Sequence, residues 1–281
     1  MVLQQAIQNA FSIDVEDYFH VEALSSAVDR SQWDRLEYRA EASTRRILEI
    51  LAGEGIRATF FILGWVAKRS PALVRDIHAA GHEVACHGLT HQRVCTQTPQ
   101  VFEAETREAK QRLEDATGVA VRGYRAATYS ITKDSLWALE ILERVGFSYD
   151  SSIFPIHHDL YGIPGSPRFP YQPEGRRLLE VPITTVEYLG QRLPAGGGGY
   201  FRLLPYSLFR AAVRRVNARD GKSAVFYCHP WEIDTGQPRI GGLSAKSRFR
   251  HYTNLDRMES RLRRLLRDFR WGRMDEVFGV A

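Results

Sequence analysis

The stretch ATFFILGWVAKRSPALVRDIHAAGHEVACH, residues 58–87, predicts the fold of this chain. It begins and ends with short apolar runs, 58–63 and 83–87, of the kind that form buried strands. Between them, residues 70–81 repeat apolar side chains at helical spacing, and a serine-proline pair and a glycine mark the two ends of the predicted helix. A strand, a helix and a second strand in this order predict two parallel strands joined by a covering helix.

The same alternation extends along most of the chain. We expect seven strands, at residues 10–14, 58–63, 83–87, 121–125, 147–151, 178–182 and 224–229. Segments with helical spacing lie between most of them, at residues 43–55, 70–81, 98–118, 132–146 and 205–221. Because several strands are apolar almost throughout, both faces of the sheet should be covered, as in a parallel α/β barrel or a doubly wound sheet.

Two segments interrupt this pattern. Residues 154–178 are rich in proline, glycine and aromatic residues and should form an ordered surface loop, and residues 230–254 should form a second long loop. A last helix should follow, with arginines opposite an apolar stripe of Leu255, Met258, Leu262, Leu265 and Phe269. These arginines could contact an acidic glycan or an anionic membrane surface, although most charge runs on a helix are only its solvated face.

The composition is that of a soluble globular enzyme. Hydrophobic residues make up 44% and charged residues 25% of the 281 residues, with 38 Lys+Arg against 33 Asp+Glu, which excludes a disordered chain. The three cysteines are scattered and imply no disulfide framework. The sequence shows neither a signal peptide nor an apolar run long enough to span a membrane, so we expect a cytoplasmic protein.

Polar side chains follow the predicted strands at the point where each strand ends. They are Asp14, Glu16 and Asp17 after the first strand, His87 and His91 after the third, Arg125 after the fourth, Asp150 after the fifth and His229 after the last. In a parallel barrel the carboxyl ends of the strands meet at one rim, where active sites form. We therefore expect these side chains to gather in one site.

His87 and His91 are candidate metal ligands. On one helical turn, residues i and i+4 share a face, and two imidazoles with one carboxylate leave an open coordination position on a divalent metal. The HExxH pattern of zincin proteases is absent. The spacing also arises by chance, so two polar loop residues are the alternative interpretation.

The acids after the first strand supply a carboxylate ligand and a general base. Along a strand, Asp14 and Glu16 point to the same side and Asp17 points to the other. We assign Asp14 as the general base and Glu16 as the metal ligand, with Asp17 as the alternative ligand. The competing interpretation is that these acids only cap the segment that follows.

Two basic residues complete the predicted chemistry. Arg125, at a buried strand end, should pair with one of the acids because an unpaired buried cation is costly, and we expect it to hold Asp14. His229 is placed to act as general acid toward a leaving group. Asp150 either orients His229 or opens a turn, and we favour the first role.

Three aromatic residues are candidates for packing on a sugar ring: Tyr129, Tyr200 and Trp231. Ordinary core packing is the alternative for each of them. The glycine run 196–199 directly precedes Tyr200, and it could let the backbone approach a sugar or could form a simple reversing loop.

Together these motifs resemble the polysaccharide deacetylases, the NodB-homology carbohydrate esterases. The resemblance rests on the aspartate-containing motif after the first strand, the H-x-x-x-H pair, the RAATY motif that begins at Arg125 and the aromatic-Cys-His motif that ends at His229, in the family's order. The segment from HPWEID to GQPRIGGLSAKSRFRHYTNL resembles the extension of a deacetylase subgroup associated with bacterial exopolysaccharide and exosortase gene clusters.

The resemblance implies a deformed (β/α)7 barrel over residues 1–230 and a C-terminal helical extension, 231–281, packed on the barrel. It implies hydrolysis of the acetamide on N-acetylated sugars of a bacterial polysaccharide or its lipid-linked precursor. It also implies a divalent metal, usually Zn²⁺. By motif matching, the base is Asp14, the ligands include His87 and His91, the residue that steadies the base is Arg125 and the acid is His229.

The chain departs from the usual motifs at four places, and two of them adjoin the predicted metal ligands. Val15 stands where the first motif has a second aspartate, so the carboxylate ligand must be Glu16 or Asp17. Gly88 stands where Ser or Thr usually follows the first histidine. The alternative functions are a metal-free amide hydrolase of a small substrate, similar to allantoinase-like relatives, and a non-catalytic glycan-binding protein. A nucleic-acid partner is not expected, because no recognition motif accompanies the basic helix.

Overall fold

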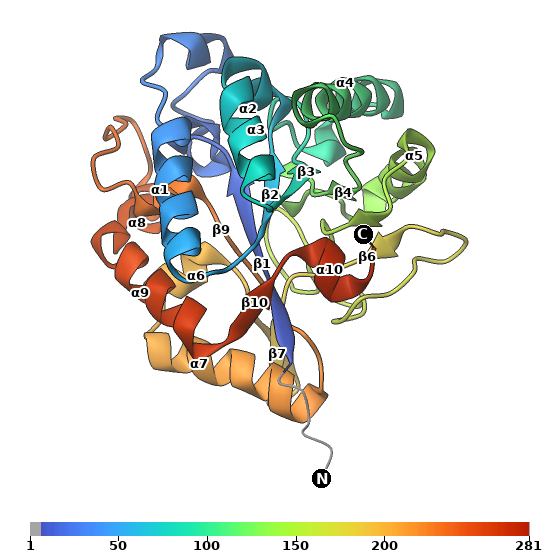
Figure 1. Cartoon of the computed structure of the whole chain (residues 1–281), viewed down its shortest axis with the longest axis vertical. Coiled ribbons are helices and arrows are strands. Elements are labelled where there is room, and N and C mark those ends of the chain that lie inside the picture. The colour runs from blue at the N-terminus through green and yellow to red at the C-terminus, as the bar shows by residue number, and fades with distance from the viewer. Residues whose placement is uncertain (1–6, 281) are drawn as a thin grey trace.

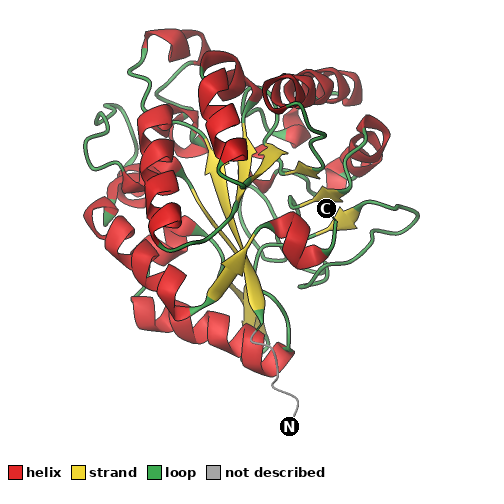
Figure 2. Ribbon diagram, in the orientation of Figure 1, coloured by secondary structure: helices red, strands yellow, loops and turns green. Residues whose placement is uncertain are grey.

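A curled parallel sheet forms the centre of the computed structural model, which describes residues 7–280 (Figures 1 and 2). All seven predicted strands are confirmed. They are β1 (Gln8–Val15), β2 (Thr59–Ile62), β3 (Glu83–Cys86), β4 (Gly123–Tyr124), β5 (Tyr149–Asp150), β6 (Leu179–Glu180) and β9 (Val225–Cys228). Their order is β9-β1-β2-β3-β4-β5-β6, and every neighbouring pair is parallel. The predicted fold, a deformed α/β barrel, is therefore confirmed.

The sheet does not close between β6 and β9 in the described part of the chain. Residues 184 and 195–197 fill this space and hydrogen-bond to β9. The amide of Val225 donates to the Thr184 hydroxyl at 2.6 Å, and the amide of Tyr227 donates to the Gly196 carbonyl at 2.8 Å. A Cβ atom on Gly196 would lie 2.5 Å from the Val225 carbonyl oxygen, so glycine is required at this close approach.

Helices cover the outer face of the sheet. The helical segments predicted from the periodicity correspond to α1 (Ala40–Gly53), α3 (Pro71–Ala79), α4 (Pro99–Thr117), α5 (Trp137–Val145), α7 (Tyr206–Arg215) and α9 (Leu255–Asp268). Four short helices were not predicted: α2 (Gly64–Arg69), α6 (Gly198–Leu203), α8 (Ala245–Tyr252) and α10 (Met274–Phe278). Helices this short give too few turns for an apolar repeat to show in the sequence.

Shorter turns connect these elements. Turns of 3-10 helix lie at Tyr18–His20, Glu22–Leu24, Arg30–Arg35, Val94–Thr96, Ala127–Tyr129, Lys133–Ser135 and Pro230–Ile233, and a π turn at Val216–Asp220 extends α7. Residues 154–178 contain no helix and no strand, as predicted. The prediction of one long loop over 230–254 is wrong, because this segment contains a 3-10 turn and α8.

The chain also forms three strands that the sequence did not predict. β7 (Thr185–Tyr188) and β8 (Gln191–Pro194) make an antiparallel hairpin outside the main sheet. β10 (Arg270–Gly272) pairs with the start of β1, so the predicted extension 231–281 adds a strand to the sheet. The described residues do not include 1–6 and 281, which fall within the predicted limits 1–230 and 231–281.

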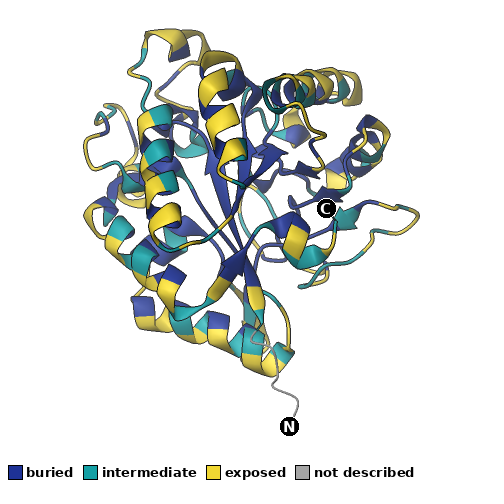
Figure 3. Cartoon of the chain, viewed as in Figure 1, coloured by how far each residue is buried: buried dark blue, intermediate teal, exposed yellow. Residues whose placement is uncertain are grey.

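Both faces of the sheet are buried, as the apolar strands predict (Figure 3). The outer face packs against the helices through residues such as Phe11, Ile13, Phe60 and Ile62. The inner face packs around a smaller cluster that includes Phe61, Ala85, Tyr149, Val225 and Met274. Within residues 7–280, no helix combines the length and the apolar character needed to cross a membrane.

Candidate active site

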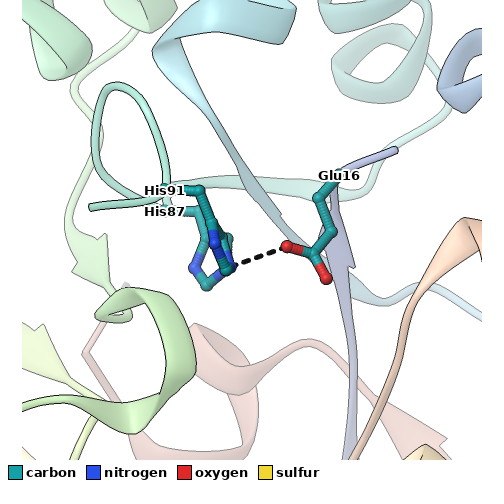
Figure 4. A group of neighbouring side chains, drawn as sticks. All are labelled: Glu16, His87 and His91. Atoms are coloured by element: carbon teal, nitrogen blue, oxygen red, sulfur yellow. Dashed lines mark ion pairs between the residues drawn. The ribbon is translucent and has the colours of Figure 1, made fainter. Parts of the chain in front are cut away.

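Glu16, His87 and His91 meet at the rim formed by the carboxyl ends of the strands (Figure 4). One potential ligand atom from each of the three side chains lies within 4.8 Å of those of the other two, and all three residues are buried. Oε2 of Glu16 lies 2.7 Å from Nε2 of His91. Glu16 directly follows β1 and His87 directly follows β3, so the parallel sheet itself brings the carboxylate and the first imidazole together.

The two histidines share one side because of a turn, and not because of a helix. The expectation of a helical turn over His87–His91 is wrong, since these residues form an irregular turn. Gly88 and His91 have the left-handed φ angles of 80° and 53°. The first of these values favours glycine, which explains why Gly88 stands at this place in the motif.

The hydrogen bonding of His87 leaves its second nitrogen facing Glu16. Nδ1 of His87 lies 2.9 Å from the carbonyl oxygen of Arg125, which can only accept, so Nδ1 carries the proton and donates. The Nε2 atom is then the unprotonated one, as in metal-bound histidines whose other nitrogen donates to a carbonyl. Burial lowers the pKa of His87 to about 4, so the ring is neutral at neutral pH.

These three residues fit a divalent cation. Oε2 of Glu16 is buried and has no hydrogen-bond partner among the described residues, although it lies close to His91. Burial opposes ionisation of Glu16, but the imidazoles of His91 and His229 outweigh it and lower the pKa of this carboxyl below its usual range. One carboxylate and two imidazoles, with no further protein ligand, form the donor set of catalytic zinc sites.

Asp17 does not face this cluster. Its Oδ1 accepts from the amide of Tyr18 at 2.8 Å, and its Oδ2 accepts from the amides of Arg39 and Ala40 at 2.6 and 2.7 Å. Burial raises the pKa of Asp17 to about 6 in spite of these three amides. The capping interpretation therefore holds for Asp17, and the geometry favours Glu16 as the carboxylate that faces the histidines.

Arg125 pairs with Asp14, as predicted. Its Nη1 lies 2.6 Å from Oδ1 of Asp14, and both side chains are buried. The guanidinium also donates to the hydroxyls of Ser12 and Ser151, at 2.9 and 3.1 Å, and its central carbon lies 4.0 Å from the ring centroid of Phe61. These contacts hold the carboxylate of Asp14 in one orientation beside the Glu16 cluster.

His229 lies on the other side of Glu16 and is held by a residue that the sequence analysis missed. Nδ1 of His229 lies 2.8 Å from Oε1 of Glu232, and Nε2 lies 3.3 Å from Oε1 of Glu16. The second oxygen of Glu232 lies 2.6 Å from Nε of Arg202, and both of these side chains are buried. The signal was present in the sequence, since Glu232 follows His229 by three residues in HPWEID.

The protonation of His229 depends on these carboxylates. Burial lowers the pKa of the ring, but Glu16 and Glu232 together raise it more, to about 9. His229 therefore carries a proton at neutral pH, which is the form that a general acid needs.

The prediction that Asp150 orients His229 is wrong. Its Oδ1 accepts from the hydroxyl of Ser152 at 2.5 Å, and Glu180 is its other close neighbour. Burial raises the pKa of Asp150 to about 6. The physical reason is the alternation of side chains, because Ser151 points inward to Arg125 and the residue before it must point to the other face.

The candidate site opens into a cavity of about 550 Å³, within the usual range for small-molecule sites. Asp14, Glu16, His87, His91 and His229 all line this cavity, as do all three predicted aromatic residues, Tyr129, Tyr200 and Trp231. These residues are far apart in the sequence but contribute to one space, because the barrel gathers the strand ends.

Two of the three aromatic residues are buried and pack against other rings. Trp231 stacks between His229 and His251, with ring centroids 5.2 and 4.4 Å away, and its Nε1 donates to Glu16 at 3.2 Å. Tyr129 is buried against neighbouring aromatic rings. Tyr200 is only partly buried and stays a candidate for contact with a sugar.

The glycine run 196–199 lies close against other side chains of the protein. A Cβ atom on Gly197 would lie 2.6 Å from the Tyr227 hydroxyl, and one on Gly198 would lie 2.1 Å from Oε1 of Glu232. Small residues here let α6 begin directly against the carboxylate that holds His229.

Comparison with known families assigns the two halves of the chain separately. Residues 31–149 match the polysaccharide deacetylase family, and residues 151–279 match a domain of unknown function (DUF3473). By this match, residues 31–149 are similar to the polysaccharide deacetylases. The deacetylase match includes His87, His91 and Arg125, whereas Asp14, Glu16 and His229 lie outside it.

Curated relatives agree with this assignment over part of their length. The chain is 32% identical over 114 residues to a chitooligosaccharide deacetylase of Rhizobium leguminosarum bv. trifolii, which is 41% of this chain and 49% of the relative. It is 28% identical over 122 residues to a peptidoglycan deacetylase of Helicobacter pylori, 43% of this chain and 40% of the relative. The matches thus span about half of the relatives' length or less.

Solved structures share the fold over nearly the whole chain. A protein of Mycobacterium smegmatis assigned as a polysaccharide deacetylase matches with a TM-score of 0.65 and 20% identity, covering 98% of this chain and 90% of that one. The allantoinase Puue matches with a TM-score of 0.59 and 16% identity, covering 96% and 88%. Because the same fold serves different amide hydrolases, the activity must be argued from the site.

Proposed function

We propose that this protein is a metal-dependent hydrolase that removes N-acetyl groups from a bacterial polysaccharide or its lipid-linked precursor. The observation that carries the proposal is the convergence of Glu16, His87 and His91 with a paired acid and a held histidine in one cavity. The relatives named as deacetylases of chitooligosaccharide and peptidoglycan support an N-acetylated glycan as the substrate class.

Glu16, His87 and His91 would hold the cation, which their donor set suits to Zn²⁺. When bound, the cation would polarise the acetyl carbonyl and lower the pKa of an attacking water. Asp14 would take the proton from that water, and the buried guanidinium of Arg125 keeps its carboxylate in place for this.

His229 would act from the other side of the cluster. Its protonated ring would donate to the nitrogen of the scissile amide, so that the products are acetate and a free amine. Glu232 stabilises the protonated ring, and Arg202 holds Glu232.

Acetate release tests this proposal directly. We expect the purified protein to release acetate from a tetramer of N-acetylglucosamine, to lose this activity with a chelator and to regain it with added Zn²⁺. Metal analysis should find about one equivalent per chain, since the three ligands form one catalytic site. Release that is unaffected by the chelator would favour the metal-free amide hydrolase. Glycan binding without release would favour the binding protein.

The pH profile tests the role of Glu232. Replacing Glu232 with glutamine removes a negative charge that raises the pKa of His229, so this pKa should fall. The alkaline limit of kcat should then move to lower pH, because His229 loses its proton earlier, and kcat near pH 8 should drop by about tenfold. The control is Glu22→Gln, which removes a cavity carboxylate paired with Arg93. An unshifted alkaline limit in Glu232→Gln would contradict this role.

We further propose that residues 1–230 act as the catalytic barrel and that 231–281 support it, since the latter contribute Glu232 and β10. Contact of the basic helix α9 with an anionic membrane surface or an acidic glycan stays a prediction. Several of its arginines are engaged within the fold. Arg261 donates to the carbonyls of Phe201, Arg202 and Leu204, Arg263 pairs with Glu259, and Arg267 pairs with Glu54.

A further inference from the structure

Helix α8 presents three side chains to the cavity of the candidate site. Lys246, Phe249 and Arg250 are spaced i, i+3 and i+4, so they share one face of the helix, and all three line the cavity. Phe249 is 59% exposed, so its ring is open to a ligand in the cavity. Tyr161 and His158, which stack at 3.8 Å, line the same cavity.

Two links hold α8 at a defined place relative to His229. His251 of α8 stacks on Trp231, which in turn stacks on His229. Arg202, which pairs with Glu232, also donates to the carbonyls of Arg250, His251 and Thr253 at the end of the helix. The cations on α8 are therefore carried by an element that is fixed to the catalytic cluster.

The carboxylates that line the cavity are paired with cations or imidazoles, whereas, among the described residues, the two cations of α8 that line it are not paired in this way. Each carboxylate that lines the cavity has a cationic or imidazole partner: Asp14 with Arg125, Glu16 with His91 and His229, Glu232 with Arg202, and Glu22 with Arg93. By contrast, within residues 7–280 the guanidinium of Arg250 makes no ion pair. Lys246 has Asp159 at 3.8 Å, and the side chains of this pair are 65% and 81% exposed.

We propose that the Lys246 and Arg250 face of α8 is a subsite for an anionic group that the substrate carries next to its N-acetylated sugar. This inference rests on the proposed function. A guanidinium and an ammonium one turn apart suit the oxygens of a carboxylate or a phosphate, and Phe249 between them suits the apolar face of a sugar ring. The substrate class is therefore an acidic N-acetylated glycan, with the charge from a uronate or from the phosphate of a lipid-linked precursor.

Kinetics with charged and neutral substrates test the subsite. The probes are a tetramer of N-acetylglucosamine, a tetrasaccharide that alternates N-acetylglucosamine with glucuronate, and UDP-N-acetylglucosamine. The wild type should show a higher kcat/KM for one of the two charged probes, and which one identifies the source of the charge. In the double variant Lys246→Gln/Arg250→Gln, the ratio of charged to neutral kcat/KM should fall by about tenfold, mainly through KM.

The matched control is Arg248→Gln, which removes a cation from the same helix at a position that does not line the cavity. It should leave the ratio unchanged. The subsite is wrong if the wild type shows no preference for either charged probe. It is also wrong if Arg248→Gln lowers the ratio as much as the double variant does.

A binding measurement separates this inference from the proposed function. If the wild type releases acetate from none of the probes, the proposed function fails, and calorimetric binding of the glucuronate tetrasaccharide and of inorganic pyrophosphate still tests the subsite. Binding that the double variant weakens and Arg248→Gln retains supports it. Equal binding by the wild type and the double variant, or no binding by either, overturns it.

Discussion

Replacing Asp14 with asparagine should lower kcat for acetate release by about a thousandfold. Asparagine has nearly the same shape and still offers an oxygen to Arg125, but it cannot take a proton from water at neutral pH. Asp14 is not one of the three residues that face the cation position, so metal content should stay unchanged. The measurement is steady-state acetate release together with metal analysis of the same preparation.

Asp150→Asn is the matched control for Asp14→Asn. Asp150 is also a buried aspartate at the end of a strand, but it faces Ser152 and Glu180 on the other side of the sheet. Its replacement should have little effect on kcat. Both variants need a thermal unfolding curve, because Asp14→Asn leaves the buried Arg125 without its carboxylate partner. A folded, metal-loaded Asp14→Asn protein with kcat close to the wild type would show that Asp14 is not the base.

Replacing Glu16 with glutamine should weaken binding of Zn²⁺ by at least about a hundredfold and should abolish acetate release. The physical reason is the loss of the one negative charge among the three residues that face the cation. The measurement is Zn²⁺ affinity by competition with a chelator of known affinity, which reads out binding independently of catalysis.

Asp17→Asn is the matched variant for Glu16→Gln, because it tests whether Asp17 only caps the following segment while Glu16 binds the metal. It should retain the affinity for Zn²⁺. It should lower the free energy of unfolding by about 1 kcal/mol, because three backbone amides donate to the two carboxylate oxygens and asparagine replaces one of these oxygens with an NH₂ group. If Asp17→Asn instead loses Zn²⁺ while Glu16→Gln keeps it, the assignment of these two acids must be reversed.

The seven strands and the long helices were predictable because each carries its own local signal. β2 and β3 are short and mostly apolar, and α4 repeats apolar side chains over five turns between Thr98, which caps its first turn, and Gly118. Elements that lack such a signal were missed. β10 has three residues and becomes a strand only because β1, more than 250 residues away in the sequence, offers its edge.

The site was predictable to the extent that parallel strands place their ends at one rim. This geometry brings Asp14, His87 and Arg125 together without any knowledge of loop conformation. The direction of a side chain beyond the end of its strand could not be predicted from this geometry. Asp17 turns away from the histidines because it accepts hydrogen bonds from the amides of Arg39 and Ala40, which leaves Glu16 to face them. In the same way, His229 pairs with Glu232 and not with Asp150.

The sequence by itself determined the barrel, the rim and the kinds of chemical group on it, because helical and strand periodicity and strand-end motifs are local properties of the chain. Only the tertiary structure decided which carboxylate joins the histidines, which residue holds His229 and which cations face the cavity. Those outcomes depend on contacts between distant segments, such as α6 with the turn after β9 and α8 with Trp231. No local pattern encodes such contacts, since they arise only when the sheet has curled and the C-terminal segment has packed on it.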